Sequence, residues 1–297
     1  MNKKFYKKTQ KIERFLMLYH LHTTTTTMMN NKKPIPQTLA KRNPHERDSH
    51  ISFDEGPHIY TIDGDSKYTS CTTWIHSHFS HFDADKILDG IFSGGRMNDP
   101  NYKYYGKSRE EIKAGWSGNE ASLLGTAMHY DIECYYNDWD VSNDSLEFQY
   151  FKKFTEDYKH LKAYRTEWMI YHKELKLAGS IDMLFEDTDG SLWIYDWKRS
   201  KDISTESFGN KTALSECIKH IPDANFYHYS LQLNVYRAIL ETKYDKVIKG
   251  MCLVRLHPNN YFNTYERIEV PFMREDVEKM FQARQDQLNN QMSSLNH

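Results

Sequence analysis

The sequence has no closely spaced cysteines, no apolar run of membrane-spanning length and no large excess of charge of either sign. Its four cysteines, Cys71, Cys134, Cys217 and Cys252, lie far apart. Zinc ribbons and iron–sulphur clusters need neighbouring thiolates, so neither is indicated, and reduced thiols in an intracellular protein are expected. The longest apolar run near the start, residues 15–19, is far shorter than the roughly 20 residues of a transmembrane helix. Neither a membrane protein nor a secretory signal is predicted.

The net charge of −2 conceals an uneven distribution. Residues 1–50 hold 11 Lys and Arg against 3 Asp and Glu, whereas the remaining residues hold 28 against 38. An acidic body does not hold nucleic acid by bulk charge. Any contact with nucleic acid must therefore be local or bridged by cations.

The first 49 residues differ in composition from the rest. They combine a lysine-rich opening, a threonine run at residues 23–27 and a linker-like stretch at residues 32–36. This composition predicts a basic, largely disordered extension with one short helix around residues 9–20. Three interpretations remain open: an organelle-targeting presequence, a tail that holds DNA, or a plain solvated extension.

From residue 50 to residue 297 the chain is patterned as one domain. Residues 58–62 and 67–69 flank an Asp-Gly-Asp turn and predict a hairpin. Capping residues and apolar periodicity predict helices at residues 72–79, 83–92, 108–116, 120–136, 146–158 and 226–241, and from residue 274. Alternation predicts strands at residues 165–171, 176–185, 191–198, 249–257 and 265–270. The core order of helix, three strands, helix and strand predicts an α+β fold with a mixed sheet flanked by helices.

Two predicted strands carry charges that an apolar strand does not need. In residues 194–198, Asp196 and Lys198 share one face, because side chains two apart on a strand point the same way. Asp182 lies in the preceding apolar strand and is expected beside Asp196 across the hairpin. Two carboxylates so close repel each other unless a counter-charge is present. A simple buried salt bridge is one explanation; a bound divalent cation, Mg²⁺ or Mn²⁺ for hard oxygen ligands, is the other.

Further polar residues precede and follow these strands. His129 and Glu133 are four apart on one helical face, and Glu167 adds a carboxylate to the first strand. Gln232 and Tyr236 share a face of a later, otherwise apolar helix. Each feature alone is also typical of a solvated face or a satisfied buried hydrogen bond.

The order of these features resembles the RecB-type branch of the PD-(D/E)XK nucleases. The series is GTxxH at residues 125–129, Glu167, GxxD at residues 179–182, DWK at residues 196–198 and QxxxY at residues 232–236. Residues 68–73 are similar to the PSVT segment that opens many of these domains. The family includes helicase–nuclease subunits, viral and phage exonucleases and mitochondrial genome maintenance exonucleases. Two departures, Cys71 for valine and Arg199 for threonine, affect no expected ligand.

The resemblance implies a restriction-endonuclease-like αβββαβ core over residues 50–297 and a role for each matching residue. Metal ligands would be His129, Asp182, Asp196 and the Trp197 carbonyl, with Mg²⁺ or Mn²⁺ as cofactor. Lys198 would position or deprotonate the attacking water. Glu167 would be a supporting acid, and Gln232 and Tyr236 would orient the site or the substrate strand.

The implied activity is metal-dependent hydrolysis of DNA, as an exonuclease acting on single strands or DNA ends in replication, repair or recombination. A separate helicase or replication protein is an implied partner, since the sequence has no P-loop. The implied location is intracellular, either in the cytoplasm or nucleus of a host cell or, through the basic start, in an organelle. The main alternative is a nucleic-acid-binding protein of the same fold without catalytic activity. An iron oxygenase and a structural protein with buried ion pairs are further alternatives.

Overall fold

A six-stranded mixed sheet forms the centre of the protein, seen in a computed structural model that describes residues 37–116 and 119–295. The path β3-β5-β6-β7-β8 is extended by β4, which pairs with β5. The pairs β4–β5, β5–β6 and β7–β8 are antiparallel, and β3–β5 and β6–β7 are parallel. The strands are β3 (Thr69–Ser70), β4 (Lys162–His172), β5 (Leu177–Glu186), β6 (Leu192–Lys198), β7 (Ile248–Arg255) and β8 (Glu266–Glu269). The predicted mixed sheet flanked by helices is confirmed.

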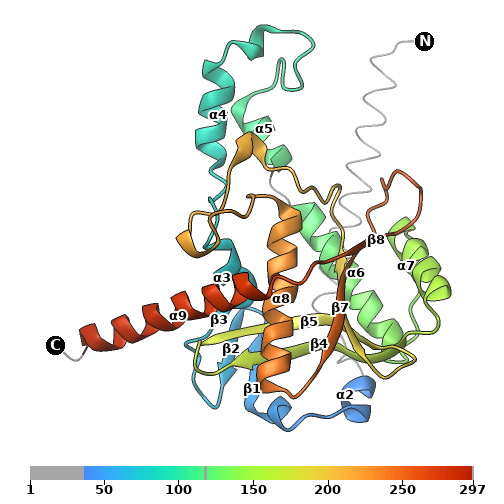
Figure 1. The fold of residues 1–297 in the computed structure, drawn as a ribbon. Helices are drawn as coiled ribbons and strands as arrows, with labels where there is room; N and C mark the ends of the chain where they lie inside the picture. Colours follow the sequence, from blue (N-terminus) through green and yellow to red (C-terminus); the bar gives the residue numbers. More distant parts are fainter. Residues whose placement is uncertain (1–36, 117–118, 296–297) are drawn as a thin grey trace.

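Helices cover both faces of this sheet (Figure 1). One face packs against α6 (Asn119–Tyr136) and α7 (Leu146–Asp157), whose apolar side chains form one core with alternate residues of β5, β6 and β7. The other face packs against α3 (Cys71–His76), α8 (Asn225–Lys243) and α9 (Arg274–Leu295) in a second core. The strands are therefore apolar on both sides, which is why a charged residue within them stands out.

Strand alternation distributes the residues of β6 between the two cores. Tyr195 and Trp197 belong to the core under α6 and α7, and Ile194 belongs to the core under α8. Asp196 and Lys198 have the parity of Ile194 and therefore point toward the α8 side. The predicted division of this strand into two faces is present in the structure.

The predicted hairpin at residues 58–69 is wrong. Strand β2 (Ile59–Ile62) pairs antiparallel with the preceding β1 (Ile51–Asp54), not with the residues that follow the Asp63-Gly64 turn. That turn is real, with positive φ at both residues, but only the single bridge between residues 62 and 65 follows it. After this turn the chain continues to β3, which pairs parallel with β5. The Thr69 N–H donates to the Lys176 carbonyl at the start of this pairing. The turn at residues 63–64 was therefore predicted correctly, but the strand that pairs with β2 was not.

Helices α4 (Ala84–Ser93) and α5 (Arg109–Trp116) project together from one end of the sheet (Figure 1). The predicted capping box is confirmed: Glu111 N–H donates to Ser108 Oγ, and Ser108 N–H donates to Glu111 Oε2. The projection also contains the 3₁₀ turn η2 (Arg96–Asn98). The long connection between β6 and α8 contains two further turns, η3 (Phe208–Asn210) and η4 (Glu216–Ile218).

The folded domain begins before the predicted boundary at residue 50. Helix α2 (Thr38–Arg42) and the turn η1 (Glu46–His50) pack on the sheet, where Leu39 is buried. Asp48 accepts hydrogen bonds from Arg165 at 2.8 Å and Trp168 at 2.7 Å. The composition of residues 37–49 did not predict this folded segment, because polar contacts rather than an apolar periodicity hold it against the sheet. Residues 1–36, including the predicted helix at residues 9–20, lie outside the described residues. In the parts of the chain that are described, none of the helices combines the length and apolar character required to cross a bilayer.

Candidate metal centre

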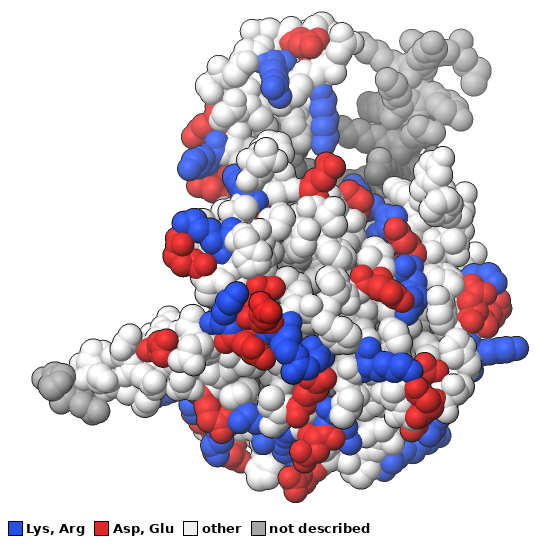
Figure 2. All heavy atoms as spheres, viewed as in Figure 1, with Lys and Arg blue, Asp and Glu red and all other residues white. Residues whose placement is uncertain are grey.

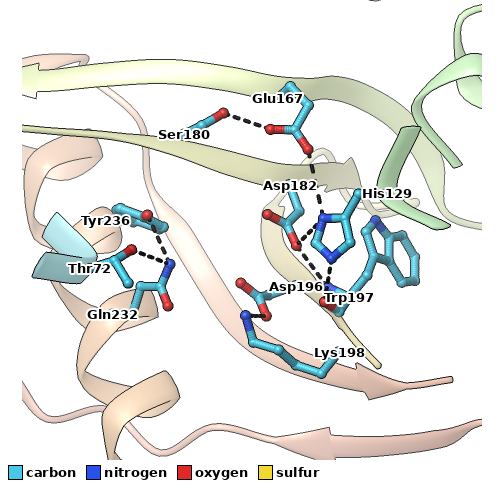
Figure 3. A network of polar contacts seen from close by, with 10 residues as sticks. All are labelled: Thr72, His129, Glu167, Ser180, Asp182, Asp196, Trp197, Lys198, Gln232 and Tyr236. Atoms are coloured by element: carbon cyan, nitrogen blue, oxygen red, sulfur yellow. Dashed lines mark hydrogen bonds and ion pairs between the residues drawn. The ribbon is translucent and has the colours of Figure 1, made fainter. Parts of the chain in front are cut away.

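Asp182 and Asp196 lie where the β5–β6 ladder ends. The last backbone pair is Met183 with Tyr195, so one more step of the same register sets the two aspartates opposite each other. At this step a side chain replaces the backbone: Asp182 Oδ2 accepts the Trp197 N–H at 2.9 Å. The predicted neighbourhood of the two carboxylates is therefore present in the structure (Figure 3).

Glu167 reaches the same place from β4 through an irregularity in that strand. Its φ of 42° lies in the left-handed region, and the β4–β5 pairing skips it, passing from Thr166–Met183 to Trp168–Ile181. Such a backbone costs roughly 1–3 kcal/mol for a residue other than glycine and collects at functional sites. Ser180 Oγ donates to Glu167 Oε2 at 2.9 Å and fixes the carboxylate.

His129 on α6 brings an imidazole to these carboxylates. Its Nδ1 lies 3.4 Å from Asp182 Oδ2 and 3.9 Å from Glu167 Oε1. One ligand atom from each of these three residues lies within 4.8 Å of the others. In the part of the chain that the structure describes, this is the group of histidine and carboxylate side chains with the spacing of a metal site.

The Trp197 carbonyl, predicted as a fourth ligand, contacts the ring of His129 in this structure. His129 Nε2 lies 2.8 Å from the Trp197 oxygen. A metal-binding histidine commonly donates its other ring N–H to a backbone carbonyl, which fixes the tautomer and the ring orientation. With Nε2 turned toward this carbonyl, Nδ1 is the ring nitrogen that faces the two carboxylates. Both backbone groups of Trp197 therefore hold ligand side chains in place.

Asp196, also predicted as a ligand, lies next to the three clustered side chains. It is buried beside the cluster but forms an ion pair with Lys198, 2.6 Å between Oδ2 and Nζ. Glu167, predicted as a supporting acid, belongs to the cluster with metal-site spacing. The Lys198 Nζ also lies 4.6 Å from the centre of the Tyr229 ring, a cation–π distance.

Burial and mutual repulsion dominate the titration of the buried carboxylates. Burial, reinforced by the charge of Asp182, raises the pKa of Asp196 to about 6. Burial also raises the pKa of Asp182, although His129 opposes the shift. Burial lowers the pKa of His129, but the charges of Asp182 and Glu167 outweigh it and raise that pKa to about 9. A cation bound here would supply positive charge and favour the deprotonated forms of these groups.

Lys198 remains charged in the metal-free protein. Burial opposes its charge, but Asp196 and Asp182 outweigh burial and raise its pKa above the ordinary value. A protonated amine cannot accept a proton from water. Of the two predicted roles for Lys198, positioning and charge stabilisation use the protonated amine, and deprotonation of water would require the amine to lose its proton first.

Gln232 and Tyr236 lie on the face of α8 that approaches the centre. Gln232 Nε2 donates to the Tyr236 hydroxyl at 3.0 Å and lies 3.3 Å from Thr72 Oγ1 on α3. Thr72 falls in the segment that resembles the PSVT motif, but its contact with the QxxxY helix was not predicted. Ser180 stands out in the sequence as a polar residue in an apolar strand, but its contact with Glu167 was not predicted, nor was the contact between Tyr229 and Lys198. Glu133 is no member of the ligand cluster described above.

Surface charge offers no broad binding field on the face shown in Figure 2. Lysines and arginines are interspersed there with aspartates and glutamates. This distribution agrees with the expectation that any contact with a polyanion is local.

No family model matches the chain, and no curated protein matches it. Among solved structures, the fold is similar to one described as the crystal structure of SSO0001, at 10% sequence identity and a TM-score of 0.33. That match covers 75% of this chain and 77% of the other. At this TM-score the likeness carries no functional argument.

Proposed function

We propose that the protein is a metal-dependent nuclease of the PD-(D/E)XK kind, RecB-type branch, acting on DNA. The observation that carries the proposal is the convergence of His129, Glu167 and Asp182 with the Asp196–Lys198 pair at one end of the sheet. A structural salt bridge accounts for Asp196 and Lys198. It does not account for the three further ligand-type groups gathered beside them.

The donor set fits a hard divalent cation. Two carboxylates and a single imidazole suit Mg²⁺ or Mn²⁺, whereas the common iron oxygenase site requires two histidines. Bound there, such a cation would acidify a water molecule and polarise a phosphate oxygen. The chain's own groups then have separate tasks: Trp197 and Ser180 orient the ligands, and Lys198 places a positive charge where the phosphate gains negative charge.

Cleavage assays test this proposal directly. Single- and double-stranded DNA labelled at either end is incubated with Mn²⁺, Mg²⁺ or EDTA, and product lengths are followed in time. We expect cleavage with either metal and none in EDTA. Product lengths would also decide whether the enzyme starts at ends, as we propose, or within the strand.

A matched pair of lysines supplies the control. Lys176 ion-pairs with Asp65 at 2.6 Å and lies 4.7 Å from the Tyr68 ring, a near copy of the surroundings of Lys198. Lys198→Met should lower the rate at least 100-fold, since one electrostatic donor in an active site contributes about that much. Lys176→Met should leave it unchanged. Binding of DNA without cleavage in any metal would instead indicate the non-catalytic alternative.

A further inference from the structure

A line of polar side chains leads away from the metal centre between α3 and α8. On α8, residues 228, 232 and 236 are four apart and share one face. On α3, residues 72 and 76 are likewise four apart. The two helices face each other in steps: Gln232 contacts Thr72 at 3.3 Å, and the His228 and His76 rings lie 5.7 Å apart. The histidine pair thus lies one helical turn from the glutamine step, toward the N-terminal end of α8.

His228 is held in a fixed orientation. Its Nε2 lies 3.0 Å from Asp223 Oδ1, and its ring packs at 4.0 Å from Phe79. The other oxygen of Asp223 accepts a hydrogen bond from Ser80 Oγ at 2.5 Å. A carboxylate that anchors one ring nitrogen leaves the other nitrogen set for a ligand. Asp223 is therefore a positioning residue for His228.

The pair lies beside Lys198. Tyr229, whose ring contacts the Lys198 amine, is the neighbour of His228 on α8. Burial lowers the pKa of His76, and the charges of His81 and Lys198 lower it further. Burial also lowers the pKa of His228, against the attraction of Asp223. Both imidazoles are therefore neutral in the free protein, and Lys198 is the positive charge beside them. An anion bound here would favour their protonated forms, and His76 is exposed to receive one.

We propose that His76 and His228 form a phosphate-binding pair that holds a phosphate of the nucleic-acid strand next to the one at Lys198. The inference rests on the proposed nuclease function and deepens it, because it assigns strand contacts beyond the metal centre. The two imidazoles come from facing helices. His76 can donate a ring N–H to the phosphate, and His228, whose Nε2 lies against Asp223, can donate Nδ1–H once the bound anion has favoured its protonation.

Substrates with single uncharged linkages test the proposal. Methylphosphonate replaces one phosphate at a time on either side of the main cleavage position of a single-stranded oligonucleotide, and KM and kcat are measured with Mn²⁺. Wild-type protein should show a KM about tenfold higher at one neighbouring position, the size of one lost hydrogen bond to a charged group. His76→Gln and His228→Gln should raise KM similarly on the unmodified strand, with kcat within about twofold. In these variants the methylphosphonate at that position should have no further effect.

The controls separate binding from structure. His220 lies in the connection between β6 and α8, where its side chain is 65% exposed and pairs with Asp276. The control variant His220→Gln should behave as wild type. Asp223→Asn should act in the same direction as His228→Gln without adding to it. If His228→Gln fails to fold, the exposed His76→Gln still gives the answer. A purely structural role would lower the rate on every substrate alike, and this outcome would overturn the inference.

Strands with different 5′ ends show whether the bound phosphate is a terminal monoester or an internal diester. Strands with a 5′-phosphate and a 5′-hydroxyl are compared: an effect that disappears with the terminal phosphate identifies a terminal monoester, and one that persists identifies an internal diester. If the histidine substitutions and the methylphosphonate raised KM additively at every position, His76 and His228 would not bind a phosphate. The proposed nuclease function would not be affected by this result. Absence of any metal-dependent cleavage by wild-type protein would remove both.

Discussion

Gly179 on β5 lies directly against the ring of Tyr236 on α8: a Cβ at residue 179 would lie 2.6 Å from Tyr236 Cε1. No real Cβ tolerates this distance, so the glycine is required for α8 to approach the sheet. This close approach sets the Tyr236 hydroxyl, which accepts the hydrogen bond of Gln232. The first residue of the GxxD series and the last of QxxxY are therefore one packing unit.

Gly179→Ala should displace Tyr236 and disturb the site. We expect a loss of roughly 1–3 kcal/mol in the free energy of unfolding, the usual cost of overpacking, together with lower nuclease activity. Urea unfolding and the cleavage rate measure both. Gly90→Ala is the control, because a Cβ there meets no atom within 4 Å and alanine favours the α4 helix. In the double variant with Tyr236→Ala, the losses should be smaller than their sum; strict additivity would contradict the contact.

Glu167→Gln should weaken metal binding. Wild-type protein at a Mn²⁺ concentration 100 times its Kd should gain about 2.7 kcal/mol of stability, and the variant should lose most of that gain. Thermal unfolding with and without Mn²⁺ measures it. Glu186→Gln is a matched control: its carboxylate is 31% exposed against 33% for Glu167, and it pairs with Lys162 away from the cluster. A full gain in Glu167→Gln would exclude Glu167 as a ligand and return Asp196 to that position.

The sequence predicted the sheet, the flanking helices and the neighbourhood of Asp182, Asp196 and Lys198. These follow from periodicity and from hairpin register, both of which act over short stretches of chain. A lone charge in an apolar strand was the informative signal, because burial makes such a residue costly unless something compensates.

The features that were missed depend on backbone detail or distant contacts. The left-handed φ of Glu167 turns its side chain into the cluster, and no residue pattern indicates such a conformation for a glutamate. Use of the Trp197 carbonyl by His129 joins residues 68 apart in the sequence. The early boundary was misjudged because Asp48 is held by Arg165 and Trp168, more than 100 residues away.

Asp196→Asn should change how stability depends on pH. The folded protein raises the pKa of Asp196 from 3.8 to about 6, so it binds this proton more tightly than the unfolded chain does. The contribution to stability is therefore complete below about pH 4 and is lost as the pH rises through 6. Relative to wild type, Asp196→Asn should gain on the order of 2–3 kcal/mol between those limits.

Urea unfolding in EDTA at pH 4.5 and 7.5 measures this difference. Asp189→Asn is the control, since Lys249 holds the pKa of that exposed carboxyl below its usual range. Stability from a lowered pKa is present above pH 3.8 and is lost only at lower pH, so this variant should show a flat difference between the two conditions. An equally flat difference for Asp196→Asn would contradict the raised pKa.

Metal binding should release a proton from His129. In the metal-free protein the charges of Asp182 and Glu167, against the effect of burial, raise its pKa to about 9, so Nδ1 carries a proton at pH 7.5. A metal requires the neutral imidazole, and binding must displace that proton. From this group alone, Mn²⁺ affinity should rise about tenfold per pH unit below 9 and level off above it.

Titration calorimetry at pH 7.5 in buffers of different ionisation enthalpy measures the number of protons released per ion, which should be close to one. His129→Gln should abolish the release, and His220→Gln is the control. Tight binding without proton release by wild-type protein would show that Nδ1 is not a ligand, and the roles assigned to the Trp197 carbonyl and to His129 would then have to be exchanged.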